Sequence, residues 1–150
     1  MKFSFFNIVA IGILSCNNQQ ADENKNENQV PVTDTETAAC YTYINNKDTV
    51  LLHVYVKDKV ATGELTYNFY EKDKNTGTIQ GELKGDTLIA DYSFVSEGVS
   101  SVREVVFLKK GNELVEGYGD ADQVDNKLVF KNRSTLNFSG ITLNPTDCEK

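Results

Sequence analysis

The chain has 150 residues, of which 39% are hydrophobic and 25% are charged. This length suits one domain with an additional segment and is short for two separate hydrophobic cores. Lys and Arg number 15 against 22 Asp and Glu, which gives a net charge of −7 at pH 7. Because nucleic acids attract clusters of Lys and Arg, a chain this acidic is not expected to bind them.

Residues 1–15 have the pattern of a secretory signal peptide. Lys2 precedes an apolar stretch from Phe3 to Leu14, and the small residue Ser15 follows. A positive start, a short apolar core and a small residue at the cleavage site define such a signal. As a helix the apolar stretch would rise only about 18 Å, against about 30 Å of bilayer hydrocarbon. The pattern therefore predicts a cleaved signal and not a membrane-spanning helix.

The four residues that end this region are Ile13, Leu14, Ser15 and Cys16. They resemble the bacterial lipobox, in which the cysteine sulfur receives a diacylglycerol group and the cysteine becomes the mature N-terminus. The resemblance implies that Cys16 is lipidated and anchors the chain to a membrane of a bacterial cell envelope, facing the periplasm or the cell surface. An ordinary signal peptide that ends near a cysteine is the alternative.

Residues 16–39 form a polar segment between this anchor and the rest of the chain. Beyond Cys16 the segment is rich in Asn and Gln, and its only sizeable apolar side chains are Val30 and Val32. Such a composition cannot bury enough apolar surface to order itself. We expect a disordered tether over 16–39 and a single folded domain over 40–150.

Cys40 and Cys148 are the cysteines that remain when Cys16 is lipidated. They lie at the two ends of the predicted domain, and an exported chain meets an oxidising compartment. We therefore predict a disulfide between Cys40 and Cys148, with two unpaired buried thiols as the alternative.

Short alternating runs of apolar and polar residues begin after position 40. Val50, Leu52 and Val54 occupy every second position, which predicts a strand with one strongly apolar face. Turn residues separate runs of this kind, and no stretch has a sustained period of 3.6 residues. The predicted strands are residues 41–45, 50–57, 62–69, 78–84, 88–94, 102–108, 114–118, 127–131 and 136–138. The domain is predicted to be all-β.

A long antiparallel meander leaves exposed edges unless it closes on itself. We therefore predict a meander of eight or nine strands that forms a small closed up-and-down barrel, with a β-sandwich as the alternative. Gly63 and Gly81 each begin a Gly-Glu-Leu tripeptide. Glycine inside a strand marks a bend or a close approach of two backbones, which a tightly curved barrel requires.

The residues that could carry chemistry are few. His53 is the chain's one histidine, and alone it supports neither a multi-histidine metal site nor a Ser-His-acid triad. Asp73–Gly77 opens like a calcium-binding loop, and Asp120, Asp122 and Asp125 form a second acidic loop, but Asp and Asn are also ordinary turn residues. The sequence predicts a protein that is not an enzyme, with no metal site and no cofactor.

Glu97, Arg103, Glu104 and Glu116 are the predicted ligand-binding residues. Glu104 shares a strand face with apolar residues, and Glu116 lies two residues after Leu114 and so shares its face. If both acids lie on paired strands they could meet in the mouth of the barrel, where mutual repulsion would raise the pKa of one carboxyl group. The alternative is a shift of register that leaves both acids in water.

Three segments complete the pattern, namely Glu71–Gly77, Gly85–Leu88 and Ser96–Val105. Together with the signal, Cys16 and the tether they resemble small envelope lipoproteins of Bacteroidota, a group without an assigned activity. In architecture the predicted domain also resembles calycin-type β-barrels. From the anchor, the predicted barrel and the lack of an evident catalytic group, we expect a lipid-anchored, non-enzymatic module that binds a small ligand or an envelope partner. The alternative is an inhibitor or accessory subunit of an envelope enzyme or complex, acting through a loop such as Glu71–Gly77.

Overall fold

The computed structural model of the protein describes residues 36–148, which fall within one compact unit. The predicted signal peptide, Cys16 and the predicted tether up to residue 35 lie outside the described residues. Between residues 36 and 148 no helix has the length and hydropathy that a membrane span requires.

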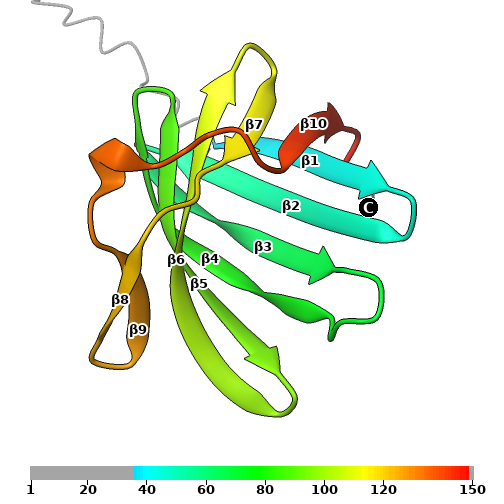
Figure 1. Ribbon diagram of the computed structural model, residues 1–150. Coiled ribbons are helices and arrows are strands. Elements are labelled where there is room, and N and C mark those ends of the chain that lie inside the picture. Colours follow the sequence, from blue (N-terminus) through cyan, green and yellow to red (C-terminus); the bar gives the residue numbers. More distant parts are fainter. Residues whose placement is uncertain (1–35, 149–150) are drawn as a thin grey trace, which may run out of the picture. The chain divides into compact units, whose positions relative to one another are not determined.

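Ten strands and one short 3-10 helix make up the described part of the chain (Figure 1). They are β1 (Thr37–Asn45), β2 (Asp48–Lys57), β3 (Val60–Asn68), β4 (Asn75–Lys84), β5 (Thr87–Ser96), β6 (Val99–Lys110), β7 (Glu113–Glu116), β8 (Ala121–Val124), β9 (Lys127–Phe130), η1 (Arg133–Thr135) and β10 (Thr142–Thr146). In β2 the alternation is as predicted, since Val50, Leu52 and Val54 are buried while Leu51 is exposed. The all-β prediction is confirmed.

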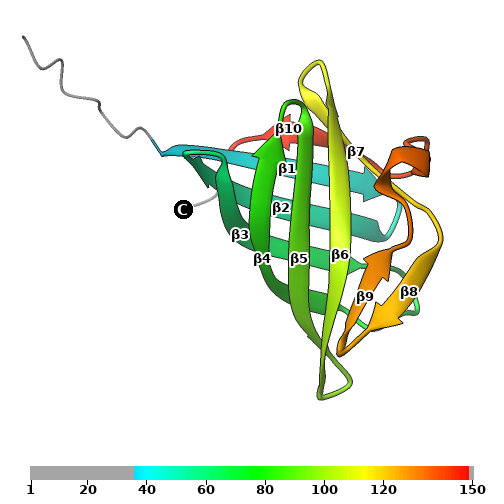
Figure 2. The same ribbon diagram turned by 90° about the vertical axis from the view of Figure 1, so that its left-hand side faces the viewer.

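The sheet closes into a barrel. Strands β1 to β7 follow one another as antiparallel neighbours, and β10 closes the ring by pairing with both β7 and β1 (Figures 1 and 2). The ring therefore has eight strands. β8 and β9 form a hairpin outside it, and β9 pairs in parallel with the first half of β6. The closed barrel is confirmed, and the β-sandwich alternative is wrong.

Two glycines permit the tight curvature of the wall. A Cβ at Gly63 would lie 1.9 Å from the carbonyl oxygen of His53, and one at Gly81 would lie 2.0 Å from that of Ile89. Any larger residue would collide with the backbone of the neighbouring strand. The predicted role of the repeated Gly-Glu-Leu tripeptide is confirmed at both positions.

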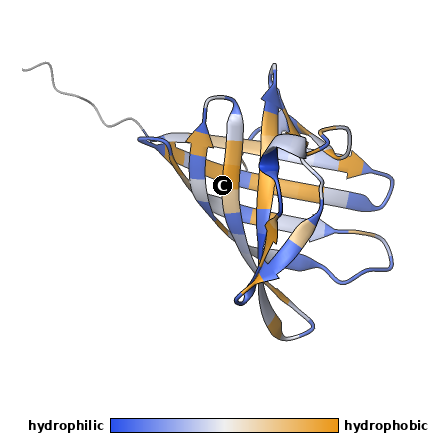
Figure 3. Cartoon of the chain, turned by 60° about the vertical axis from the view of Figure 1, so that its left-hand side comes forward, coloured by the Kyte–Doolittle hydropathy of each residue, from blue (hydrophilic) through white to orange (hydrophobic). Residues whose placement is uncertain are grey.

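The hydrophobic core fills the middle of the barrel. Hydrophobic residues gather in the strands, whereas the turns are mostly hydrophilic (Figure 3). The largest fully buried side chains are Tyr92, Phe107, Leu52, Leu65, Ile79, Leu143, Val50 and Val106. All of these except Val106 belong to one core cluster, whose buried members come from every strand of the ring except β1. The middle of the barrel is therefore a packed core.

The Cys40–Cys148 disulfide is present and confirms the predicted bridge. It joins β1 to the segment after β10, with a Cα–Cα distance of 5.2 Å. β10 pairs with β1 next to this bridge, at Cys40 with Thr146. The disulfide therefore fastens the strand that closes the barrel to the first strand of the meander.

The fold begins earlier than predicted. β1 starts at Thr37, so three residues assigned to the tether belong to the barrel. Thr37 and Ala39 pair with Val56 and Val54 of β2. Thr and Ala expose too little apolar surface for alternation to reveal a strand, and the stabilisation comes from pairing with β2.

The structure differs from the predicted strands in three places near the end of the chain. β8 occupies residues assigned to an acidic loop, and the strand predicted at 136–138 is reduced to one bridge between Tyr118 and Asn137. β10 was missed because it contains Pro145, which cannot donate a hydrogen bond to a neighbouring strand. Proline is tolerated there because pairing of β10 with β7 ends at Leu143.

Candidate functional site

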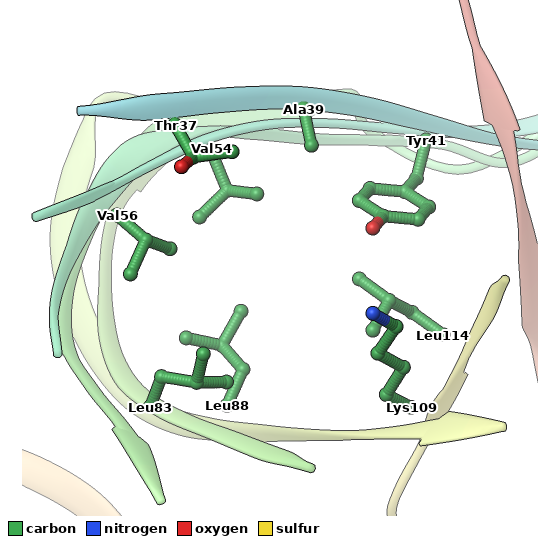
Figure 4. A pocket seen from close by; sticks show the side chains of 9 residues that line it. All are labelled: Thr37, Ala39, Tyr41, Val54, Val56, Leu83, Leu88, Lys109 and Leu114. Carbon is green, nitrogen blue, oxygen red and sulfur yellow. The ribbon is translucent and has the colours of Figure 1, made fainter. Parts of the chain in front are cut away.

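An apolar cavity of about 240 Å³ lies at the end of the barrel where β1 begins and β6 ends (Figure 4). Its lining residues come from β1, β2, β4, β5, β6 and β7. They are Thr37, Ala39, Tyr41, Val54, Val56, Leu83, Leu88, Lys109 and Leu114. Because so many strands contribute, the cavity exists only when the barrel is closed.

The cavity has an apolar floor and one cationic group at its rim. Val54, Leu88 and Leu114 are buried, whereas Lys109 is exposed. Among the described residues that line the cavity, Lys109 alone is charged. Its amine and the hydroxyl of Tyr41 point into the space between the labelled side chains (Figure 4). The apolar body of a ligand could therefore pack against the apolar lining, and an anionic end could contact the Lys109 amine.

Local sequence explains how the lining forms. Leu83 and Leu88 pair across the turn between β4 and β5, so both aliphatic side chains point the same way. Ala39 contributes only a methyl group to the wall, which leaves space beside it (Figure 4). Lys109 lies two residues after the buried Phe107 on β6 and so shares its inward face.

The opposite end of the barrel holds a buried carboxylate. The hydroxyl of Tyr67 donates a hydrogen bond to Oε1 of Glu116 over 2.6 Å, and that of Tyr118 donates to Oε2 over 2.9 Å. Burial raises the pKa of Glu116 above its ordinary value, although both hydrogen bonds and Arg103 act to lower it. Burial and the neighbouring Glu116 carboxylate raise the pKa of Tyr67 well above its usual range.

Arg103 lies among aromatic rings at this same end. Its guanidinium carbon is 4.8 Å from the ring centroid of Tyr67, 5.5 Å from that of Tyr92 and 5.6 Å from that of Phe94. These distances allow cation–π attraction. The buried Nε of Arg103 has no hydrogen-bond partner among the described residues. Burial raises the pKa of Tyr92 to about 12, while Arg103 acts to lower it.

Glu104 lies on the outer face of the barrel. Its carboxylate forms an ion pair with Arg133 of η1, and Nε of Arg133 donates to Oε1 over 2.7 Å. The backbone N–H of Phe130 donates to Oε2 over 3.1 Å. Glu104 is therefore held by the segment that contains β9 and η1, and it contributes nothing to the interior.

The structure brings two of the four predicted ligand-binding residues together and separates the other two. Arg103 and Glu116 share the interior at one end, Glu104 faces outward, and Glu97 lies in the exposed turn between β5 and β6 with a φ of 49°. Glu104 and Glu116 therefore do not form the expected pair of carboxylates. Neither residue lines the apolar cavity, which lies at the other end of the barrel.

Sequence reasoning missed the residues that do line the cavity. One signal was present, because Lys109 is a charged residue that continues the alternation of Val105 and Phe107. The position of Ala39 could not be found this way, since it lies in the part assigned to the tether.

Within residues 36–148 one group of His, Cys, Asp or Glu side chains is arranged so that it could hold a metal ion, and it consists of Cys40, His53 and Cys148. The two acidic loops form no such group in this part of the chain. Asp122 instead forms an ion pair with Lys131 over 3.2 Å.

No protein-family model matches this chain, and neither a curated protein nor a solved structure matches it significantly. The resemblance to Bacteroidota lipoproteins and to calycin-type barrels therefore remains a prediction.

Proposed function

We propose that this protein is a non-enzymatic binding module whose barrel takes up a small amphiphile, with its apolar body in the cavity and an anionic head near Lys109. The observation that carries this proposal is an apolar cavity of about 240 Å³ with a single charged residue in its described lining. In keeping with the lipobox pattern, the module is lipid-anchored through Cys16 in a bacterial cell envelope.

The cavity volume limits the size of the ligand. A cavity of about 150 Å³ holds one benzene molecule, which corresponds to about 25 Å³ for each nonhydrogen atom. At that ratio a cavity of about 240 Å³ accommodates about 10 nonhydrogen atoms. Octanoate has this size, so a medium-chain carboxylate is a suitable probe.

The charge of Lys109 sets the preferred sign of the head group. A carboxylate at the rim gains Coulomb attraction to the amine, while an ammonium group would be repelled. Because Lys109 is exposed, we expect the difference to be modest, on the order of 1 kcal/mol. Most of the binding free energy comes from the apolar walls.

Isothermal titration calorimetry with octanoate and octylamine tests the proposal on the full chain carrying Cys16→Ser. Octanoate is expected to bind with a Kd below about 1 mM, which is about −0.4 kcal/mol for each nonhydrogen atom. Lys109→Glu should weaken octanoate binding about fivefold and favour octylamine. Lys110→Glu, which changes the charge equally at a residue outside the cavity lining, is the matched control.

Ala39→Leu supplies a second test, because the larger side chain fills part of the cavity while remaining apolar. It is expected to abolish octanoate binding without unfolding the barrel. If octanoate binds equally to the parent chain, Ala39→Leu and Lys109→Glu, binding occurs elsewhere and the cavity proposal is wrong. The better proposal would then be the alternative function, an inhibitor or accessory subunit of an envelope enzyme that acts through the loop Glu71–Gly77. One contact supports a fixed position for that loop, because the backbone N–H of Tyr70 at its base donates a hydrogen bond to Asp48 over 2.7 Å.

A further inference from the structure

The chain's one histidine lies beside the disulfide on the outer face of the barrel. His53 of β2 is the direct cross-strand partner of Cys40 of β1. Three possible ligand atoms lie within 4.8 Å of one another, namely the Sγ atoms of Cys40 and Cys148 and one ring nitrogen of His53. Two thiolates and an imidazole are the ligands that zinc prefers in proteins.

The surroundings of this group give access and favour a cation. A surface hollow of about 410 Å³ is lined by Cys40, His53, Glu64 and Asp147, among others. Glu64 is the cross-strand partner of His53 on the side away from Cys40. Two carboxylates beside the group attract a divalent cation and repel an anion.

We propose that reduction of the Cys40–Cys148 disulfide converts this group into a zinc site with Cys40, His53 and Cys148 as ligands. A water molecule or an external ligand takes the fourth position. The site is separate from the interior cavity, so it is independent of the amphiphile-binding function.

The group needs only a small rearrangement to bind zinc. Zn–S bonds of about 2.3 Å in a tetrahedron place two sulfur atoms about 3.8 Å apart. Cys148 lies beyond the last residue of β10, so it can move away from Cys40 without breaking a strand. Cys40 and His53 stay in place because both lie in paired strands.

The redox step balances with a dithiol as the reductant. The dithiol gives two electrons and two protons to the Sγ–Sγ bond, and it becomes a disulfide while Cys40 and Cys148 become thiols. Zinc then binds the two thiolates and neutral His53, and two protons are released to water. The oxidised protein lacks thiolates and should not bind zinc at this place.

Cobalt titration of the full chain carrying Cys16→Ser provides the test, with a phosphine as reductant and Co²⁺ as the spectroscopic probe. The reduced protein should develop a thiolate-to-cobalt charge-transfer band and the visible bands of tetrahedral Co²⁺, and Zn²⁺ should remove both. The oxidised protein should show neither. His53→Gln should weaken zinc binding at least about tenfold, since even the loss of a residue that only hydrogen-bonds to a metal ligand costs that much.

Leu51→Gln is the matched control, because Leu51 lies on the same outer face of β2 and is 51% exposed. It should leave zinc affinity unchanged. Equal loss in both variants, or no loss in His53→Gln, would overturn the assignment. Near-ultraviolet circular dichroism of the tyrosines monitors the fold. If reduction unfolds the barrel and Zn²⁺ does not restore its signal, the proposed site does not exist.

Discussion

Glu104 and Glu116 are both buried, at 5% and 6% exposed, yet they face opposite sides of one barrel wall. Phe107 of β6 pairs directly with Glu116 of β7, so both point into the interior. Glu104 lies three residues before Phe107 and therefore points outward. One acid is bonded by two tyrosine hydroxyls and the other by Arg133 and a backbone N–H, so each can be altered without disturbing the other.

Glu116→Gln should reduce the loss of stability that the protein suffers as pH rises. The pKa of Glu116 is raised in the folded state, so between its ordinary value of 4.5 and the raised value the folded state binds more protons than the unfolded state. The free energy of unfolding therefore falls with rising pH in that window, by up to about 1.4 kcal/mol for each pH unit. Below the ordinary value this penalty is absent.

Guanidinium unfolding as a function of pH measures the effect. The amide oxygen that Glu116→Gln introduces still accepts a hydrogen bond from one tyrosine, but the amide cannot ionise. A plot of the free energy of unfolding against pH should therefore fall less steeply for this variant than for the parent chain. Glu113→Gln is the control, because Glu113 lies on the same strand and is exposed. A slope that is equal in the parent chain and Glu116→Gln would show that Glu116 does not titrate as described.

Arg133→Gln should destabilise the protein more than Glu104→Gln does. The Glu104 side chain is 1% exposed and that of Arg133 is 52% exposed. Removal of Arg133 leaves the buried Glu104 carboxylate with the N–H of Phe130 as its remaining partner. We expect the free energy of unfolding to fall by about 1–3 kcal/mol, and nearer the lower value because solvent screens the exposed Arg133 side. Removal of the Glu104 charge leaves a guanidinium that water can solvate.

Denaturant unfolding of a double-mutant cycle checks this asymmetry. The double variant Glu104→Gln/Arg133→Gln should be more stable than Arg133→Gln alone, because it contains no buried charge without a partner. Lys131→Gln, whose ion pair with Asp122 is exposed on both sides, should change stability by less than about 0.5 kcal/mol. A double variant less stable than either single variant would contradict the interpretation.

Gly81→Ala should destabilise the barrel by at least about 3 kcal/mol, because the added Cβ would lie 2.0 Å from the carbonyl oxygen of Ile89 and the neighbouring strand would have to shift. Gly85→Asn is the control. Gly85 lies in a turn with a φ of 58° and open space around it, and asparagine adopts this backbone conformation readily. In thermal unfolding, Gly81→Ala should lower the melting temperature strongly, because the added Cβ collides with the next strand. Gly85→Asn should change it little, because the turn requires only a residue that tolerates a positive φ.

Replacement of both Cys40 and Cys148 by serine should lower the free energy of unfolding by about 4–5 kcal/mol, the value expected from chain entropy for a sequence separation of 108 residues. The comparison is made by guanidinium unfolding of the oxidised parent chain and the double variant, both with Cys16→Ser. A difference below about 1 kcal/mol would mean that pairing of β10 with β1 and β7 closes the barrel without help from the bridge.

Much of the fold was predictable because the alternation of apolar and polar residues within a β-strand shows which side chains share a face. Alternation in β2 assigned Val50, Leu52 and Val54 to one buried face, and the turns between the strands predicted a meander. Closure was predicted because an open meander would leave two exposed edges. The two cysteines at the ends of the domain were enough to predict the bridge. β10 carried too weak a signal, because a five-residue strand with a proline is stabilised by its neighbours rather than by its own residues.

The candidate site was less predictable, because it depends on which residues meet around a closed ring. By itself the sequence determined the strand class and placed Glu104 on the strand face opposite that of Val105 and Phe107. The tertiary structure alone decided which of these faces points inward, that Tyr67 meets Glu116 and that Arg133 meets Glu104. It also decided that open space lies beside Ala39 and Lys109. The alternation of side chains is set by their own strand, whereas their partners and the space beside them are set by register and closure of strands far apart in the chain.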